Sequence, residues 1–212
     1  MRRALLISLS LILALVAWTT VGADDGFYVI SGVKGNFAPV PKTGQTTPYA
    51  AGDDGTLQKG VASPTPRFTD NNNGTVTDKL TGLIWMKNAN AFGTKTWADA
   101  LIAANGLKSG DAGTGLTDGS KPGDWRLPNI RELQSLIDCE FYYPALPNTL
   151  GTGKWVEGDP FQGVHPESYW SSTTNAAAAA TTTAWCVDFA YGSVNAYGKS
   201  GNYYVWCVRG GQ

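Results

Sequence analysis

The sequence has little of what metal-dependent or nucleophilic enzymes need. His165 is its only histidine, and its three cysteines show no CxxC spacing. Zinc and copper sites are built mainly from His and Cys side chains, so neither metal is expected. His165 lies in "GVHPES", and the chain contains no GxSxG motif. A Ser-His-Asp hydrolase is therefore not indicated.

No run of basic residues occurs anywhere in the chain. The 212 residues include 16 Lys and Arg against 17 Asp and Glu, and removal of Arg2 and Arg3 leaves 14 − 17 = −3. Nucleic acids and strongly sulfated polymers bind to clusters of positive charge. We therefore expect neither of them as a partner.

A second long apolar run is also missing. The first one, "ALLISLSLILALVAW", follows Arg2 and Arg3 and is followed by the small residues of "TVGA". This order is typical of a secretory signal peptide, residues 1–23, cleaved after Ala23. A membrane-spanning helix is the alternative, but "DDG" follows where a basic flank would be expected. The product is thus expected to be exported to the periplasm, cell surface or medium, without a membrane span.

Three cysteines in an exported chain allow one disulfide and leave one thiol. Cys207 lies in the last expected strand and can pair with Cys139 or with Cys186. The Cys139–Cys207 bridge is slightly favoured because it would close the longer loop and restrict the unfolded chain more. The sequence leaves both pairings open.

Residues 24–66 are rich in Gly, Pro and Thr and predict an irregular lead-in that wraps the domain or links it to something else. Asn73-Gly74 then lies between alternating segments, which predicts a β-hairpin. A cation-binding loop is the alternative, with Asp70, Asn72 and Asp78 as ligands. Its glycine stands one place too early and its bidentate acid is missing, so the hairpin is preferred.

Two segments carry helix-capping signals. Thr96 with Asp99 begins a helix over 96–105, and Asn129 with Glu132 begins one over 129–138. A long irregular stretch, 139–168, follows the second helix, and the rest of the chain reads as β-strands. The expected fold class is α+β.

The motifs "WRLP", "YWSST" and "YVWCVRGG" occur where the expected helices and strands begin or end. In these motifs residues 67–211 resemble a domain-of-unknown-function family that is also found at the C-terminus of the bacterial collagen-like adhesin Lcl. The resemblance implies a C-type-lectin-like domain over 67–212. Its two capped helices would pack on a small, mostly antiparallel sheet with long irregular loops, a central strand 169–173 and a last strand 203–209.

The resemblance implies binding rather than chemistry. Related lectin-like domains are variable proteins of diversity-generating retroelements, in which Asn, Tyr and Ser vary over a constant strand scaffold. Here the core beneath the surface would be Trp185, Phe189, Val205 and Trp206. The ligand-binding surface would be Ala190, Tyr191, Ser193, Asn195, Tyr197, Asn202 and Tyr203. The expected ligand is a protein or a carbohydrate at a cell surface.

The alternatives to this surface are a calcium-dependent sugar site, a reactive cysteine pair and a pair of catalytic carboxylates. Calcium-dependent lectins of this fold carry Glu-Pro-Asn or Gln-Pro-Asp and then Trp-Asn-Asp, and this chain has neither. The formylglycine-generating enzymes share the fold and would use Cys186 and Cys207. The carboxylates available for acid–base chemistry are Asp124, Glu132, Asp138 and Glu140, of which Glu132 is more simply a capping residue. We expect no catalytic centre, metal or cofactor.

A structural role is the second function class. The lead-in could pack against a neighbouring copy and build an envelope or filament subunit, and a homo-oligomer fits either class.

Overall fold

The computed structural model describes residues 40–177 and 182–210. The predicted signal peptide, 1–23, and the first part of the lead-in, 24–39, lie outside the described residues. The helices are α1 (Asp54–Leu57), α2 (Trp97–Gly106) and α3 (Ile130–Gln134). The strands are β1 (Phe68–Asp70), β2 (Thr75–Asp78), β3 (Ile84–Met86), β4 (Thr94–Lys95), β5 (Ser168–Thr174), β6 (Thr183–Asp188), β7 (Val194–Gly198), β8 (Tyr203–Tyr204) and β9 (Val208–Arg209).

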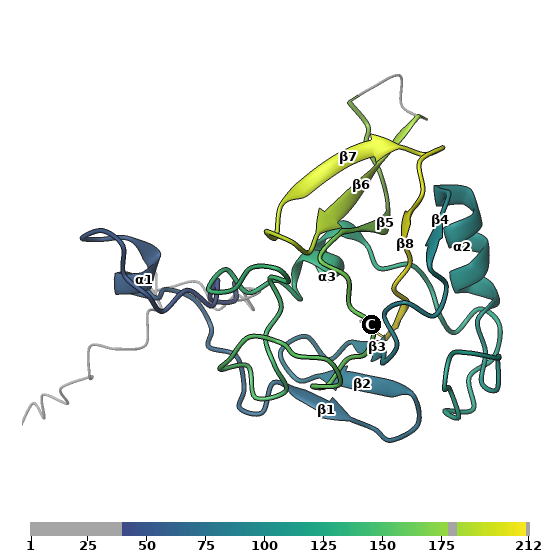
Figure 1. The fold of residues 1–212 in the computed structure, drawn as a ribbon, viewed down its shortest axis with the longest axis horizontal. Coiled ribbons are helices and arrows are strands. Elements are labelled where there is room, and N and C mark those ends of the chain that lie inside the picture. Colours follow the sequence, from purple (N-terminus) through teal and green to yellow (C-terminus); the bar gives the residue numbers. More distant parts are fainter. Residues whose placement is uncertain (1–39, 178–181, 211–212) are drawn as a thin grey trace, which may run out of the picture. The chain divides into compact units, whose positions relative to one another are not determined.

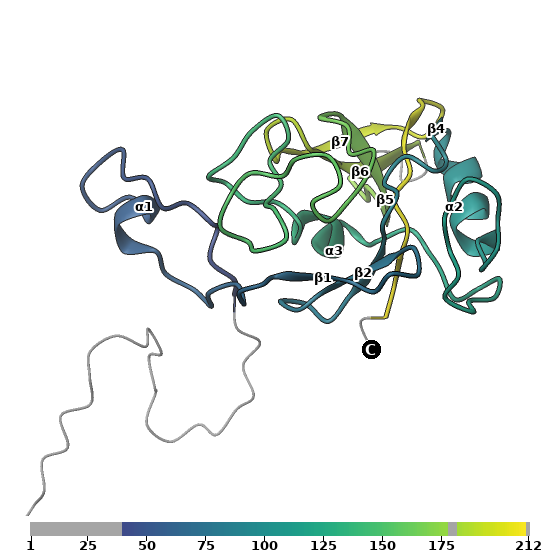
Figure 2. The same cartoon turned by 60° about the horizontal axis from the view of Figure 1, so that its bottom comes forward.

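The strands form two sheets. One has four strands in the order β1-β2-β3-β9, and the other has five in the order β4-β8-β5-β6-β7. Only the β5–β8 pair is parallel among the described ladders. In the views of Figures 1 and 2, α3 lies between the two sheets and α2 lies beside β4 and β8. The expected α+β class with mostly antiparallel pairing is confirmed.

The β1–β2 hairpin is formed as the Asn73-Gly74 signal predicts. The register pairs Asp70 with Val76, and Gly74 adopts a φ of 81°, which a glycine reaches without strain. The geometry does not favour the alternative cation loop, because both of its carboxylates form ion pairs with basic side chains. Asp78 is buried against Arg67 at 3.2 Å, and Asp70 pairs with Lys87 at 2.6 Å.

Both predicted helix starts are observed. The Thr96 hydroxyl accepts the Asp99 N–H at the start of α2, and Asn129 with Glu132 forms a complete capping box on α3. The second helix is shorter than the expected 129–138, since α3 ends at Gln134. The next bonds join residues three apart, from Leu136 N to Leu133 O and from Ile137 N to Gln134 O, so the chain turns more tightly than an α-helix.

The expected last strand, 203–209, is two strands. β8 pairs with β4 and β5 in one sheet, whereas β9 pairs with β3 in the other. Figure 1 shows this segment running from the five-stranded sheet towards β3. The intervening Val205, Trp206 and Cys207 are buried, so the chain crosses the core between the sheets.

An aromatic core fills the space around this crossing. The Trp206 ring contacts Phe161 with centroids 4.9 Å apart, Phe189 at 5.6 Å and Trp85 at 5.7 Å. Phe189, Val205 and Trp206 are buried as expected. Trp185 is only half-buried, which corrects its assignment to the core. The register of β5 and β6 is interrupted between Trp170 and Thr174, and Trp185 has no direct partner on β5.

All three cysteines are free thiols, which corrects the expected disulfide. Cys186 lies on β6 opposite Trp170, whereas the backbone oxygen of Cys207 accepts the Met86 N–H beside the other sheet. Cys139 is exposed after α3 and donates its N–H to Thr43 O. The three thiols therefore lie on different parts of the fold.

The described part of the lead-in contacts the segment after α3. One carboxylate oxygen of Glu140, Oε2, accepts the N–H groups of Thr46 at 2.7 Å and Thr47 at 3.0 Å. The Cys139 N–H donates to Thr43 O at 2.8 Å. Residues 43–47 are thereby held against the segment Cys139–Glu140.

Candidate functional site

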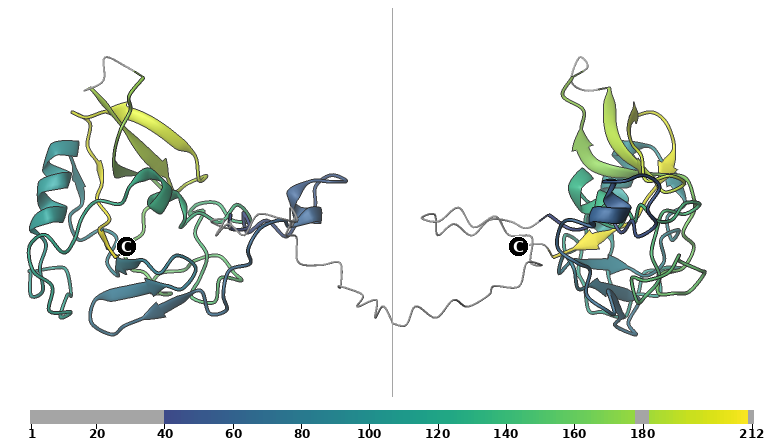
Figure 3. Two further views of the ribbon diagram at one scale, coloured as in Figure 1. Left: turned by 180° about the vertical axis from the view of Figure 1, so that it is seen from behind. Right: turned by 90° about the vertical axis from the view of Figure 1, so that its left-hand side faces the viewer.

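Two of the predicted ligand-binding residues, Asn195 and Tyr197, lie on β7, an edge strand of the five-stranded sheet. The left view of Figure 3 shows this sheet from behind. The register places Asn195 opposite Cys186 and Tyr197 opposite Ala184. Directly opposed residues of an antiparallel pair project from the same face. The Asn195 side-chain amide also donates to Ser193 Oγ at 3.0 Å. Ser193, Asn195 and Tyr197 therefore follow one another along one side of β7.

Tyr197 and Tyr203 form a stacked pair on this face. Their ring centroids are 4.7 Å apart and the planes differ by 20°. The edge of the pair rests on the buried Trp170, whose ring is 4.9 Å from that of Tyr203 at 88°. We call Ser193, Asn195, Tyr197, Asn202 and Tyr203 the tyrosine face. Both tyrosines are half-buried, and Ser193 and Asn202 are exposed.

The position of Tyr203 depends on a glycine and on its neighbours. A Cβ at Gly201 would lie 2.9 Å from Cε2 of Tyr203, so a side chain there would displace the ring. Burial, together with the nearby Tyr197 and Cys186, raises the pKa of the Tyr203 hydroxyl. The hydroxyl is therefore a hydrogen-bond donor at neutral pH.

Tyr191 does not join the tyrosine face. It lies in the turn between β6 and β7, is 71% exposed, and meets the exposed Tyr143 with ring centroids 6.0 Å apart. The turn is fixed to the loop after α3 by the bond from Tyr143 N to Ala190 O, 2.7 Å. Tyr142 is exposed next to Tyr143, with the Lys154 ammonium 5.5 Å from its ring centroid. We call Tyr142, Tyr143 and Tyr191 the tyrosine turn.

Sequence reasoning missed Tyr142 and Tyr143. They lie in the irregular stretch 139–168, and nothing local shows that this loop meets the β6–β7 turn. The one available signal was the Tyr-Tyr-Pro phrase in a long loop, where function is concentrated.

Ala190 is not available for ligand contact, which corrects the prediction. It is 6% exposed, and its N–H donates to Asp188 Oδ1 at 2.6 Å. Its carbonyl oxygen accepts the Tyr143 N–H. Ala190 thus holds the turn that presents Tyr191.

Lys199 fastens the far end of β7. Its ammonium lies 3.9 Å from the Trp97 ring centroid and donates to Thr174 Oγ1 at 3.0 Å. The Trp97 N–H donates to the Lys199 carbonyl, and Trp97 Nε1 donates to Ser171 O at 2.9 Å. These bonds tie the end of β7 to α2 and β5.

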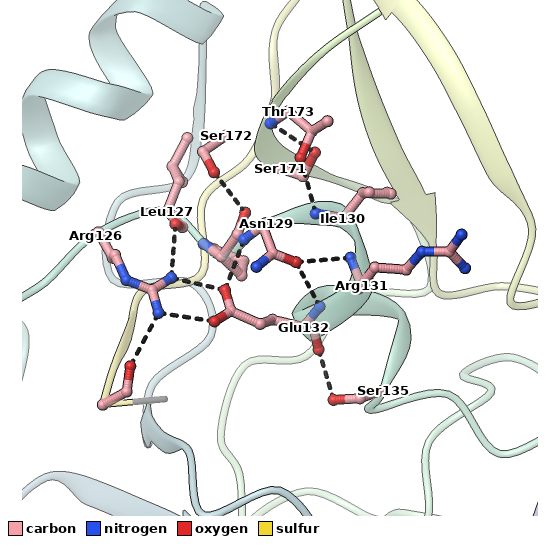
Figure 4. A network of polar contacts seen from close by, with 12 residues as sticks. Arg126, Leu127, Asn129, Ile130, Arg131, Glu132, Ser135, Ser171, Ser172 and Thr173 are labelled. Atoms are coloured by element: carbon pink, nitrogen blue, oxygen red, sulfur yellow. Dashed lines mark hydrogen bonds and ion pairs between the residues drawn. The ribbon is translucent and has the colours of Figure 1, made fainter. Parts of the chain in front are cut away.

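The "WRLPNIREL" phrase builds a polar network, shown in Figure 4, and not an acid–base pair. Both guanidinium ends of Arg126 donate to Glu132, at 2.7 and 2.8 Å, and Nη2 also donates to Gly210 O. Burial favours the neutral form of Glu132, but the hydrogen bonds from Arg126 and Asn129 outweigh it and lower its pKa. The Ile130 N–H donates to Thr173 Oγ1. The network joins α3 to β5 and to the C-terminal segment.

Cys186, Cys207 and His165 are packed among neighbouring residues. Burial raises the pKa of both the Cys186 and the Cys207 thiols, which disfavours the reactive thiolate. The His165 ring stacks on Tyr204 with centroids 4.4 Å apart. Within residues 40–177 and 182–210, no three His, Cys, Asp or Glu side chains gather as metal ligands do. No helix of that part is long and apolar enough to span a membrane.

The chain was also compared with known protein families. The model of the Lcl C-terminal domain matches residues 74–209, well over half of the chain. The matched segment includes the tyrosine face, the tyrosine turn and the Arg126–Glu132 network. A search of curated proteins found no match.

Proposed function

This chain belongs to the Lcl C-terminal domain family, and we propose that it is an exported, non-catalytic binding protein. Its ligand is a protein or a carbohydrate at a cell surface, bound mainly by the tyrosine face. The observation that carries the proposal is the Tyr197–Tyr203 stack, which is held on the buried Trp170 and remains half exposed.

Such a pair suits binding because little conformational entropy is lost when a ligand immobilises the two rings. Tyrosine offers a large contact area and has few rotatable bonds to immobilise. The stack and the edge contact of Tyr203 with Trp170 already restrict these rings, so little entropy remains to be lost when a ligand binds. Asn195, Ser193 and Asn202 add hydrogen-bonding groups that can adapt to different ligands.

The finer proposal is a C-type-lectin-like fold whose surface is diversified by a retroelement. It rests on the Tyr, Asn and Ser residues along β7 and β8, which follow the buried residues of β6 in the chain. A reverse-transcriptase gene and a template repeat matching the codons of residues 168–211 should lie near the gene. A genomic neighbourhood without either would leave a binding domain of fixed sequence.

The binding proposal is tested with protein and glycan arrays, followed by affinity measurements on variants. Tyr197→Phe with Tyr203→Phe keeps the stacked rings and removes both hydroxyls, so the fold should persist. We expect binding to weaken at least tenfold, as for contact residues at an interface centre. Tyr49→Ala is the control, because Tyr49 is 79% exposed in the lead-in. Unchanged affinity in the Phe variant and in Tyr191→Ala would argue against the proposal.

A structural subunit is the second candidate, and one observation favours it. β7 is an edge strand, so one row of its backbone groups is free to pair with another chain. Size-exclusion chromatography with light scattering separates the two functions. Polymers that grow with concentration would favour the structural subunit, and a discrete monomer or small oligomer would favour the binding protein.

A further inference from the structure

A polar cleft lies at the tip of the β1–β2 hairpin, among residues outside the tyrosine face and the tyrosine turn. Its volume is about 400 Å³, and it is lined by Asp70, Asn72, Gly74, Lys87, Asn88, Gly113, Thr114, Gly115 and Gln162. This volume is near the lower end of the range for small-molecule sites. We infer that the cleft is a second binding site, for a neutral polyhydroxylated ligand such as a single sugar residue.

The walls of the cleft are held by main-chain hydrogen bonds. The Lys87 N–H donates to Gly74 O at 2.9 Å, and the Gln162 N–H donates to Lys87 O at 2.9 Å. The Asn88 side-chain amide reaches Gly113 O at 3.3 Å. These bonds connect four segments, at residues 74, 87–88, 113 and 162, so the cleft is formed before any ligand arrives.

Gly74 allows the hairpin tip to approach the loop at residues 113–115. A Cβ at this position would lie 2.4 Å from the carbonyl oxygen of Gly115 and 2.9 Å from Cα of Leu116. Both contacts are with backbone, which cannot rotate away. The narrow join between hairpin and loop therefore requires glycine.

The charges in the cleft cancel. Lys87 Nζ lies 2.6 Å from Asp70 Oδ2. Burial favours the neutral acid, but the hydrogen bond from Lys87 outweighs it and lowers the pKa of Asp70, so the pair is ionised at neutral pH. A metal cation would meet the Lys87 ammonium, and an anion would meet the Asp70 carboxylate. Neither charge is favoured in a ligand.

The lining selects hydroxyl groups. It contains ammonium and amide donors next to carboxylate, amide and main-chain acceptors, and a hydroxyl both donates and accepts. No large apolar side chain lines the cleft. The apolar side chains of a peptide or the acyl chains of a lipid would therefore find no apolar surface there. A sugar residue bound through its hydroxyls matches this lining, and its affinity should be weak because no aromatic ring is there to stack on it.

The side-chain amide of Gln162 is available to bind a ligand. Its main-chain N–H and C=O bond to Lys87 and Ala89, but its side-chain amide makes no hydrogen bond to any described residue. The residue is exposed at the cleft. Its side chain can therefore be removed without breaking a bond that holds the wall.

The test is a titration of the purified chain with glucose, galactose, mannose and N-acetylglucosamine, followed by amide NMR shifts. We expect at least one sugar to give saturable shifts at Lys87, Asn88, Gly113 and Gln162, with Kd on the order of 1–10 mM. Gln162→Ala should weaken this binding about tenfold, the effect of one lost hydrogen bond. Gln134→Ala is the matched control, since Gln134 is exposed on α3 outside the cleft.

Three results would overturn the inference. The first is that none of the four sugars causes saturable shifts at the cleft, and the second is that Gln162→Ala binds sugar as the parent does. The third is that calcium chloride or sodium acetate shifts these amides while the sugars do not. The variant that combines Tyr197→Phe with Tyr203→Phe should bind the sugar normally. The cleft and the proposed function can thus fail independently of each other.

Discussion

The tyrosines of the C-terminal meander differ in how much of each ring is packed. Tyr191 is 71% exposed and touches only the exposed Tyr143 among the described aromatic rings. Tyr197 and Tyr203 are half-buried and pack against the core, with Trp170 beneath them. Tyr197 and Tyr203 therefore contribute to the stability of the fold as well as to the contact surface. The effect of substituting either one has to be measured on both stability and ligand affinity.

At this scale the two kinds of tyrosine should separate in stability. Tyr203→Ala removes the stack on Tyr197 and the edge contact with Trp170, and should lower the free energy of unfolding by about 1–3 kcal/mol. Tyr191→Ala should change it by no more than about 0.5 kcal/mol. Urea unfolding followed by tryptophan fluorescence measures both values. Equal losses in the two variants would contradict this division.

At the scale of elements, α3 is only five residues long, yet it connects distant parts of the chain. Asn129 and Glu132 cap its first turn, and Arg126 links Glu132 to Gly210 O. Ser172 donates its N–H to Pro128 O from the neighbouring β5. So short a helix has little stability of its own, and these polar contacts with its surroundings hold it.

The charge of Glu132 should make this connection sensitive to pH. Its folded pKa is lowered, so its contribution is complete above the unfolded pKa and is lost as the pH falls through the folded value. Glu132→Gln should therefore be less stable than the parent at pH 7, and the difference should shrink below about pH 4. Thermal unfolding of both proteins from pH 7 to pH 3 measures it. A difference that is constant with pH would show that charge is not involved.

At the scale of the whole molecule, the Glu140 carboxylate and the Cys139 N–H hold residues 43–47 of the lead-in to the domain. Glu140 accepts two main-chain N–H groups and the Thr47 hydroxyl. The hydrogen bond from the Thr47 side chain, followed by those from the Thr46 and Thr47 main chain, lowers the pKa of Glu140. The contribution of Glu140 to this attachment is therefore complete above the ordinary pKa of a glutamate and is lost as the pH falls through the lowered value.

Substitution of this carboxylate should loosen the lead-in without unfolding the domain. In Glu140→Gln we expect faster hydrogen–deuterium exchange in peptides that contain Thr46 and Thr47, because the acceptor is no longer charged. Glu157→Gln is the control, since Glu157 accepts the Gly163 N–H in another loop. Exchange that is unchanged at Thr46 and Thr47 would mean that other contacts hold the segment.

The sequence by itself determined the features that depend on neighbouring residues. The Asn73-Gly74 turn, the Thr96 cap and the Asn129–Glu132 capping box each involve residues within four positions of one another, and all three are observed. The alternation of polar and apolar residues also placed Asn195 and Tyr197 on one side of β7. Local backbone geometry and side-chain alternation are sufficient for such predictions.

Only the tertiary structure decided where distant segments meet. The crossing at Trp206 divides the expected last strand between two sheets. The loop after α3 lies against the β6–β7 turn, where the Tyr143 N–H donates to Ala190 O and the Tyr143 ring lies beside Tyr191. The cleft likewise combines Asp70, Lys87 and Gln162 with the loop 113–115. These contacts depend on how distant segments pack together in the folded chain, and no local pattern in the sequence predicts them.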